Sequence, residues 1–149
     1  MFICLGNICR SPMAEFIFKD MLRKSGLENA FFVSSCATST EEVGNRIYPP
    51  ARRELARRKV PFDDHRAVQL TYSDYDKYDL FVCMEDSNIR GITRIFGQDK
   101  MDKVHKLLDF ADGGNVADPW YTDDFDTAFN DISRGCEGLL KYLVKRGER

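Results

Sequence analysis

The chain has 149 residues, a net charge of −2, 43% hydrophobic residues and 31% charged residues. This is an ordinary balance for one globular domain over residues 1–149, and it excludes a disordered chain, a collagen and a coiled-coil rod. The small net charge argues against a nucleic-acid binder, and no apolar run approaches the roughly 20 residues of a membrane span. The first four residues lack the basic and apolar regions of a signal peptide, and five cysteines, an odd number, indicate no disulfide framework. We therefore expect a reduced, cytoplasmic protein that contacts neither membrane nor nucleic acid.

Short apolar runs alternate with amphipathic stretches, which predicts an α/β fold with a parallel sheet. Residues 1–3 are expected to end the first strand. Ser11 and Pro12 are expected as the N-cap and first residue of a helix that ends near Gly26. Residues 31–33, Phe-Phe-Val, are predicted as the second strand.

The middle of the chain predicts two further helices and two further strands. Residues 49–59, opened by two prolines, predict a helix. Residues 80–84 form a nearly continuous apolar run, typical of a strand that is covered on both faces. Residues 87–96, followed by a glycine, predict a helix, and residues 104–108 predict the fourth strand.

The last helix has the clearest pattern, because its apolar residues repeat every three or four positions from Phe125 to Leu143. Its start is acidic and its end is basic, through Asp123, Asp124, Asp126, Lys145 and Arg146. We interpret the three carboxylates as partners of the helix dipole rather than as a metal site.

Residues 4–11, Cys-Leu-Gly-Asn-Ile-Cys-Arg-Ser, join the first strand to the first helix, at an edge of the sheet where ligands bind. Gly6 permits a tight turn and Asn7 tolerates a left-handed conformation, so the amides of this loop can converge on a tetrahedral oxyanion. Arg10 adds a planar fork that matches two phosphate oxygens. Cys4 would lie beneath the anion, in a positive field that favours a nucleophilic thiolate.

The spacing of Cys4 and Arg10 is weak evidence by itself, because it arises easily by chance in a chain rich in both residue types. Without their context, Cys4 is a buried apolar residue and Arg10 a solvated charge. The strand before the loop, the glycine and asparagine within it and the Ser-Pro helix start after it favour the catalytic interpretation.

A phosphocysteine route needs a proton donor for the leaving alkoxide, on another loop at the same edge of the sheet. Asp118 is the best candidate, although Asp-Pro also commonly opens a plain turn. Trp120 and Tyr121 could form the walls of a slot for a flat aromatic substrate, or could simply pack before the last helix.

Together these segments resemble the low molecular weight protein tyrosine phosphatases over essentially the whole chain. Residues 4–12 match that family's phosphate loop, residues 83–88 its Cys-Met-Asp/Glu-x-x-Asn segment, and residues 118–121 its Asp-Pro-aromatic-Tyr loop. The resemblance implies a single domain with a four-stranded, parallel, twisted sheet, helices on both faces and a flavodoxin-like topology. It also implies no cofactor and no metal.

The resemblance further implies the reaction, which is hydrolysis of phosphotyrosine proteins and small aryl phosphates, with inorganic phosphate or vanadate as inhibitors. Cys4 would be the nucleophile, Arg10 would clamp the phosphoryl group, and Asp118 would be the general acid and then the base. Ser11 would hydrogen-bond the Cys4 thiolate, and Cys9 would be a redox partner of Cys4.

Other roles follow from the same resemblance. Asn7 would hold the shape of the loop, supported by Ser35 and His65. The residues expected around the phosphate and substrate are Leu5, Gly6, Asn7, Ile8, Cys9, Ser11, Glu41, Trp120 and Tyr121.

Three positions depart from the family's pattern. Glu41, followed by Glu42, stands where the family often has Trp or Tyr beside the substrate. Residues 48–50 read Tyr-Pro-Pro in place of Asp-Pro-Arg, and Val68 replaces a basic residue. These differences concern substrate preference rather than chemistry.

Other function classes fit the sequence less well. An arsenate reductase of the same fold would relay oxidation through a cysteine pair near the end of the third strand, but after Cys83 the next cysteine is Cys136. A phosphoprotein-binding module would normally lack the nucleophile or the acid. A zinc site lacks ligands, since His65 and His105 are the only histidines and no Cys-x2-Cys occurs.

Overall fold

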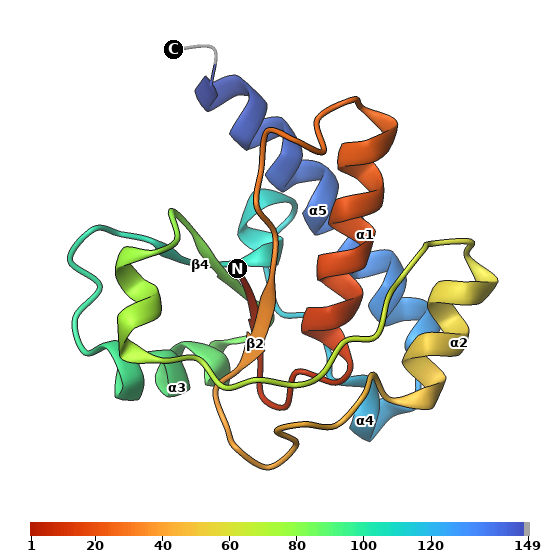
Figure 1. Ribbon diagram of the computed structural model, residues 1–149, viewed down its shortest axis with the longest axis horizontal. Coiled ribbons are helices and arrows are strands. Elements are labelled where there is room, and N and C mark those ends of the chain that lie inside the picture. Colours follow the sequence, from red (N-terminus) through yellow and green to blue (C-terminus); the bar gives the residue numbers. More distant parts are fainter. Residues whose placement is uncertain (148–149) are drawn as a thin grey trace.

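Within the residues that the structure describes, 1–147, four parallel strands form one sheet in the order β2-β1-β3-β4 (Figure 1). In this computed structural model the strands are Phe2–Cys4 (β1), Ser35–Ala37 (β2), Phe81–Cys83 (β3) and Val104–Lys106 (β4). From β1 the chain first forms β2 at one edge of the sheet, and then returns to form β3 on the other side of β1. This reversal creates the crevice at the carboxyl ends of the strands where such sheets bind ligands. The predicted four-stranded parallel sheet is confirmed.

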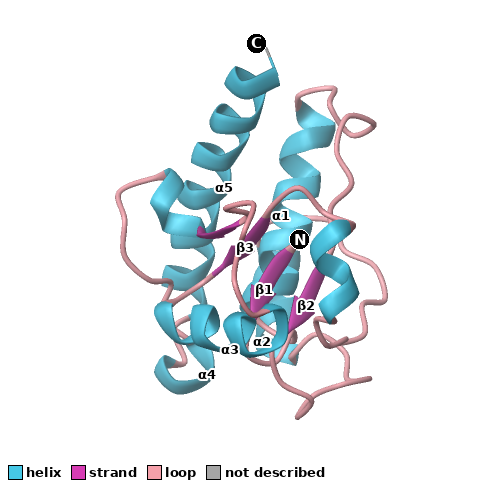
Figure 2. Ribbon diagram, turned by 90° about the vertical axis from the view of Figure 1, so that its left-hand side faces the viewer, coloured by secondary structure: helices cyan, strands magenta, loops and turns pink. Residues whose placement is uncertain are grey.

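Helices cover both faces of this sheet, as predicted (Figure 2). α1, α2 and α5 pack together on one face, and α3 lies on the other beside a 3-10 turn, η1. The bounds are Arg10–Lys24 (α1), Pro49–Arg57 (α2), Tyr72–Asp76 (η1), Asp86–Phe96 (α3), Leu107–Phe110 (η2), Pro119–Thr122 (α4) and Phe125–Gly147 (α5).

The strand side chains alternate between two cores. Phe2 and Val82 pack beneath α1 and α5, whereas Ile3 and Phe81 pack against α3. Because both faces are buried, the central strands need apolar side chains at successive positions. Complete burial of such a side chain stabilises the fold by roughly 1.5–3 kcal/mol.

The prediction of a strand at residues 31–33 is wrong. β2 begins at Ser35, which faces Phe2, so residues 31–33 lie beyond the end of β1 and have no strand to pair with. Phe31 and Val33 instead pack on the edge of the core, while the Phe32 side chain is exposed. The apolar run therefore marks a packed edge segment, and the less apolar Ser-Cys-Ala that follows is the strand.

The first helix begins at Arg10 with Cys9 at the N-cap, so the prediction that Ser11 caps this helix is wrong. The Ser11 hydroxyl contacts the Cys4 sulfur and the Asn7 side chain instead of a backbone N–H of the helix. The predicted helix end is confirmed, because Gly26 follows the C-cap with φ +69°.

The other predicted helices and β3 lie close to their expected ranges, but the fourth strand is shorter than predicted. Leu107 and Leu108 are both buried in the core, whereas in an extended strand they would point to opposite faces. The chain therefore coils into η2 after Lys106. α4 lies where only a loop was expected.

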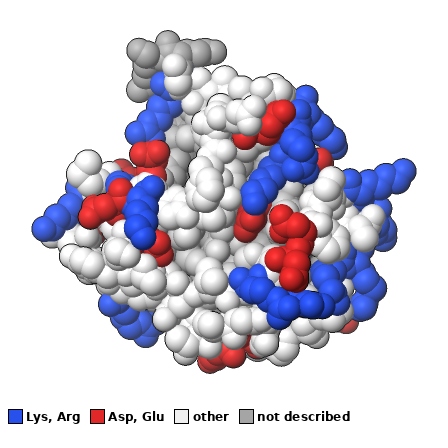
Figure 3. All heavy atoms as spheres, viewed as in Figure 1, with Lys and Arg blue, Asp and Glu red and all other residues white. Residues whose placement is uncertain are grey.

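On the face of the molecule shown in Figure 3, basic and acidic side chains are interspersed rather than gathered into one patch of a single sign. Among residues 1–147, no helix combines the length and the apolar character that crossing a bilayer would require.

Candidate active site

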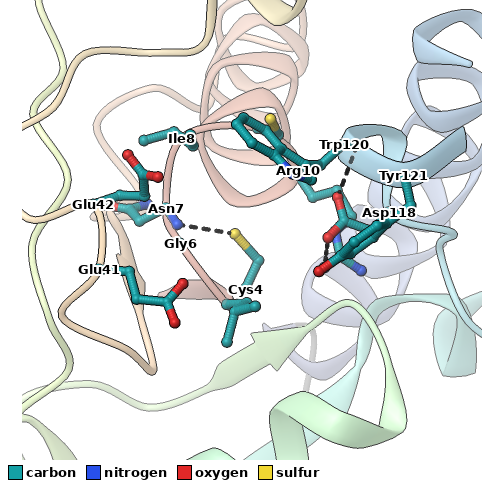
Figure 4. A pocket seen from close by; sticks show the side chains of 12 residues that line it. Cys4, Gly6, Asn7, Ile8, Arg10, Glu41, Glu42, Asp118, Trp120 and Tyr121 are labelled. Atoms are coloured by element: carbon teal, nitrogen blue, oxygen red, sulfur yellow. Dashed lines mark hydrogen bonds and ion pairs between the residues drawn. The ribbon is translucent and has the colours of Figure 1, made fainter. Parts of the chain in front are cut away.

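A pocket of about 130 Å³ opens where the chain leaves β1 and enters α1 (Figure 4). Its lining brings the predicted phosphate loop together with the segments after β2 and before α5. The lining residues are Cys4, Leu5, Gly6, Asn7, Ile8, Cys9, Arg10, Glu41, Glu42, Asp118, Trp120 and Tyr121. Three predicted site residues, Ser11, Ser35 and His65, do not line the pocket and lie in the network that supports the loop.

The loop backbone is arranged to bind an anion. Asn7 has φ +59°, the left-handed conformation that asparagine tolerates. The loop carbonyls are bonded to neighbouring segments, through Thr38 N to Cys4 O, Ser39 N to Leu5 O and Tyr48 N to Ile8 O. By contrast, the N–H groups of Gly6, Ile8 and Cys9 donate no hydrogen bond to any residue within 1–147. Unpaired N–H groups at the start of a helix are the donors that a tetrahedral oxyanion binds.

Cys4 lies at the base of this pocket. Its Sγ is 3.0 Å from the Ser11 Oγ and accepts a hydrogen bond from the Asn7 N–H at 3.2 Å. The sulfur therefore lies at the N-terminal end of α1, beside a hydroxyl group and a backbone N–H.

The Asn7 side chain is fully buried and connects the loop to three other segments. Its Nδ2 donates to the Ser11 Oγ at 2.8 Å and to the Ser35 Oγ at 3.0 Å. Its Oδ1 accepts from the Val68 N–H at 3.1 Å and lies 3.0 Å from the His65 Nε2. The residues predicted to support Asn7 therefore contact it directly.

Glu15 completes this network, and sequence reasoning did not identify it. It lies on α1 and is buried, with Oε1 accepting from the Ser35 Oγ at 2.6 Å. The His65 Nδ1 lies 3.9 Å from the same oxygen. The available signal was a carboxylate within a stretch of helix that is otherwise apolar, because such a residue needs polar partners when buried.

Arg10 is 1% exposed, and its guanidinium is held by two carboxylates. Its Nη1 donates to the Glu85 Oε2 at 2.6 Å and to the Val116 O at 2.9 Å, and its Nη2 lies 3.3 Å from the Asp118 Oδ2. Burial by itself lowers the pKa of Arg10, but the negative charges of Cys4, Asp118 and Glu85 raise this pKa above its ordinary value. Arg10 therefore remains a cation beside the pocket.

Glu85 is a second residue whose role sequence reasoning missed. It lies two residues after β3, at the same edge of the sheet as the phosphate loop. Burial raises its pKa, but the Ser87 hydroxyl and the Arg10 charge outweigh burial and hold it below the ordinary value. The sequence offered two signals, its place shortly after a central strand and its acidic position in the matched segment 83–88, but neither pointed to Arg10.

Asp118 is the N-cap of α4, and its Oδ1 accepts a hydrogen bond from the Trp120 N–H at 3.1 Å. Its other oxygen is the one that faces Arg10. The capping bond and the ion pair together hold the carboxyl group at the side of the pocket, across from the phosphate loop (Figure 4).

Two glutamates form the wall opposite Asp118 and Trp120 (Figure 4). The Glu42 Oε2 accepts from the Asn45 Nδ2 at 2.6 Å, and the Glu42 stem packs against Gly6. The Glu41 carboxylate has no hydrogen-bond or ion-pair partner among residues 1–147. Glu41 therefore contributes an unpaired negative charge to the pocket.

Cys9 also lines the pocket, but its side chain is nearly buried. Burial, followed by the nearby charge of Cys4, raises the pKa of the Cys9 thiol far above its ordinary value. At neutral pH this cysteine is a neutral thiol. Within residues 1–147, no group of three or more His, Cys, Asp or Glu side chains is arranged to hold a metal ion.

The sequence of this chain is similar to those of known phosphatases. The family described as low molecular weight phosphotyrosine protein phosphatase matches residues 1–149. The chain is 35% identical to the low molecular weight protein-tyrosine-phosphatase YfkJ of Bacillus subtilis over 148 residues, which cover 97% of this chain and 95% of that protein. It is also 35% identical to the human low molecular weight phosphotyrosine protein phosphatase over 150 residues, covering 95% and 92% of the two chains.

Solved structures give the same result. The crystal structure of YfkJ superimposes with a TM-score of 0.93 at 36% identity, over 97% of this chain and 93% of that chain. The low molecular weight protein tyrosine phosphatase of Streptococcus pyogenes superimposes with a TM-score of 0.85 at 33% identity, over 95% and 90%.

Proposed function

Because the chain belongs to the low molecular weight phosphotyrosine protein phosphatases, we propose that it hydrolyses phosphotyrosine and small aryl phosphates through a phosphocysteine intermediate. The observation that carries this proposal is the placement of Cys4 beneath unpaired loop amides, with Asp118 on the opposite side of the same pocket.

In the first step, the substrate phosphate occupies the loop, where the amides and Arg10 stabilise its charge as the transition state forms. The Cys4 thiolate attacks phosphorus, and the bond between phosphorus and the phenolic oxygen breaks. Asp118 in its carboxylic acid form donates its proton to that oxygen, so the leaving group departs as a neutral phenol.

In the second step, the Asp118 carboxylate takes a proton from water as the water oxygen attacks phosphorus. The bond between sulfur and phosphorus breaks, inorganic phosphate is released and Cys4 returns as a thiolate. The Ser11 hydroxyl, 3.0 Å from the Cys4 sulfur, stabilises this leaving thiolate.

The partners follow from this chemistry. Substrates are phosphotyrosine-containing proteins, and inorganic phosphate is a product that competes for the loop. Vanadate inhibits because its five-coordinate form resembles the transition state. A reducing compartment such as the cytoplasm suits an enzyme that depends on an accessible thiolate.

The test is turnover of p-nitrophenyl phosphate in a chelator, with vanadate as inhibitor. Rapid quenching with labelled substrate is expected to trap phosphate on the wild-type protein. Cys4→Ser is expected to abolish both turnover and the trapped label while still binding phosphate, because the amides and Arg10 remain. Appreciable turnover by the variant would contradict the assignment of Cys4, and phosphate binding without wild-type turnover would indicate a binding module.

A further inference from the structure

Tyr48 does not line the pocket, but it contacts both the phosphate loop and the segment that carries Asp118. It lies between the segment after β2 and α2, where it is the N-cap of α2. Its N–H donates to the Ile8 O at 2.8 Å, which fixes the backbone of Tyr48 to the phosphate loop. Tyr48 is also one of the positions at which the chain departs from the family's pattern.

The Tyr48 ring packs against the segment that carries Asp118. Its centroid lies 4.8 Å from the Trp120 ring at an interplanar angle of 49°, and 6.1 Å from the Phe125 ring at 32°. Trp120 belongs to α4 and Phe125 begins α5, so one side chain contacts both helices that flank the turn at residues 123–124.

α4 has four residues, and a helix of that length has almost no stability of its own. Its position therefore depends on packing. The Trp120 N–H donates to the Asp118 carboxylate, so a displacement of Trp120 displaces the proton donor as well.

We propose that Tyr48 is a positioning residue that holds α4, and through it Asp118, at a fixed place relative to the phosphate loop. The connection runs from the Ile8 carbonyl through the Tyr48 backbone and ring to Trp120, and from the Trp120 N–H to Asp118. This inference rests on the proposed function, because Tyr48 acts only through the acid.

The test compares Tyr48→Ala with Tyr48→Phe, which keeps the ring. Tyr142→Ala is the matched control, because Tyr142 packs on Phe110 with a similar geometry, 5.0 Å and 47°, and neither ring lines the pocket. Thermal unfolding of each variant separates loss of folding from loss of activity. Because Trp120 is the only tryptophan of the chain, its fluorescence reports directly on this contact.

Aryl phosphates with leaving groups of increasing pKa give the decisive measurement. Loss of a ring pair lowers the equilibrium constant for the docked position of α4 by about threefold to tenfold. Tyr48→Ala is therefore expected to lose up to about that much kcat on phosphotyrosine, little on p-nitrophenyl phosphate, and to show a red-shifted Trp120 emission. Tyr48→Phe and Tyr142→Ala are expected to match the wild type in all of these measurements.

The double variant with Asp118→Ala distinguishes the two proposals. If Tyr48 acts through the acid, Tyr48→Ala adds no further loss in the Asp118→Ala background. An additive loss, or an equal loss on both kinds of substrate, would overturn the role of Tyr48 while leaving the acid assignment intact. If Asp118→Ala itself shows no dependence on the leaving group, the proposed role of Asp118 fails first.

Discussion

We expect Glu41 to determine which phosphopeptides the pocket prefers. It presents an unpaired carboxylate to the pocket. Two hydrogen bonds hold its segment in place: the Ser39 hydroxyl donates to the Leu5 carbonyl at 2.8 Å, and the Gly44 N–H donates to the Ala67 carbonyl at 2.9 Å. A fixed negative charge there repels acidic peptides and attracts a cationic side chain beside the phosphotyrosine.

We therefore expect a preference in kcat/KM for phosphopeptides with Lys or Arg next to the phosphotyrosine over matched acidic peptides. Exposed charge pairs are screened, so the preference is expected to be a few-fold, about fivefold at most, and to shrink with added salt. Glu41→Gln is expected to remove it. Asp63, an exposed acid that does not line the pocket, gives the control Asp63→Asn, which should keep the preference. A wild type without the preference contradicts this expectation.

Cys9 is expected to protect the nucleophile against irreversible oxidation. Peroxide converts the Cys4 thiolate to a sulfenic acid, which condenses with the Cys9 thiol to give a disulfide and water. A dithiol then restores both thiols. Because the pKa of Cys9 is raised, its thiolate fraction at neutral pH is small and grows about tenfold per pH unit, so disulfide closure should accelerate as the pH rises.

The measurement is activity recovered by dithiol after a pulse of peroxide. Wild type is expected to recover, and Cys9→Ser is expected to remain largely inactive. Cys136→Ser, in the core away from the pocket, is the control and should recover like the wild type. Equal recovery of Cys9→Ser and wild type would show that Cys9 only packs under the loop.

The sequence predicted Cys4, Arg10 and Asp118 because each lies in a short motif with a mechanism of its own. It did not predict Glu15 and Glu85, and it left Tyr48 as a departure without a role. These three make contacts between elements far apart in the chain, such as Arg10 with Glu85 and Tyr48 with Trp120. Only the folded arrangement supplies those pairings.

At the scale of elements, the approach of α5 to η2 depends on two glycines. A Cβ on Gly138 would lie 1.8 Å from the Phe110 carbonyl oxygen, and a Cβ on Gly135 would lie 2.4 Å from the Leu107 side chain. The atom of Phe110 that this Cβ would meet belongs to the backbone, so it cannot move aside by a side-chain rotation. Gly138→Ala is therefore expected to force the two elements apart.

Overpacking of this kind typically costs 1–3 kcal/mol, so thermal and urea unfolding of Gly138→Ala should show a loss of at least about that size. Gly147→Ala lies in the same helix and its Cβ would meet nothing within 4 Å, so its stability should be equal or slightly higher. The prediction fails if both variants unfold alike.

Helices were the elements that the sequence predicted best, because α5 shows its period over many turns. The three-residue strands are too short for a period to be read. Near β2, the apolar residues lie in the edge segment before the strand rather than in the strand itself. After β4, two adjacent leucines favoured a longer strand, but the chain forms η2 there and buries both side chains. In each case tertiary packing, which local sequence does not contain, decided the outcome.

At the scale of the whole molecule, the buried cysteines are expected to make the free energy of unfolding fall at alkaline pH. Burial raises the pKa of Cys83 to about 12 and raises the pKa of Cys36 and Cys136 still further above the ordinary thiol value. The unfolded chain releases these protons near pH 8.5, whereas the folded protein keeps them. The stabilisation is therefore complete below that pH and is lost progressively as the pH rises toward the folded pKa values.

We expect the free energy of unfolding to be flat near neutrality and to fall above about pH 9, with each buried thiol contributing up to about 1.36 kcal/mol per pH unit. Cys136→Ala isolates one such thiol. Removal of the sulfur lowers stability at pH 7, because it leaves a small cavity in the core. It also removes one thiol whose ionisation makes the free energy of unfolding depend on pH. The variant should therefore lose stability less steeply than the wild type between pH 9 and 11, and urea unfolding across that range measures both slopes. Lysines and tyrosines titrate equally in the two proteins and cancel in the difference, so parallel slopes would show that Cys136 ionises as readily in the folded protein as in the unfolded chain.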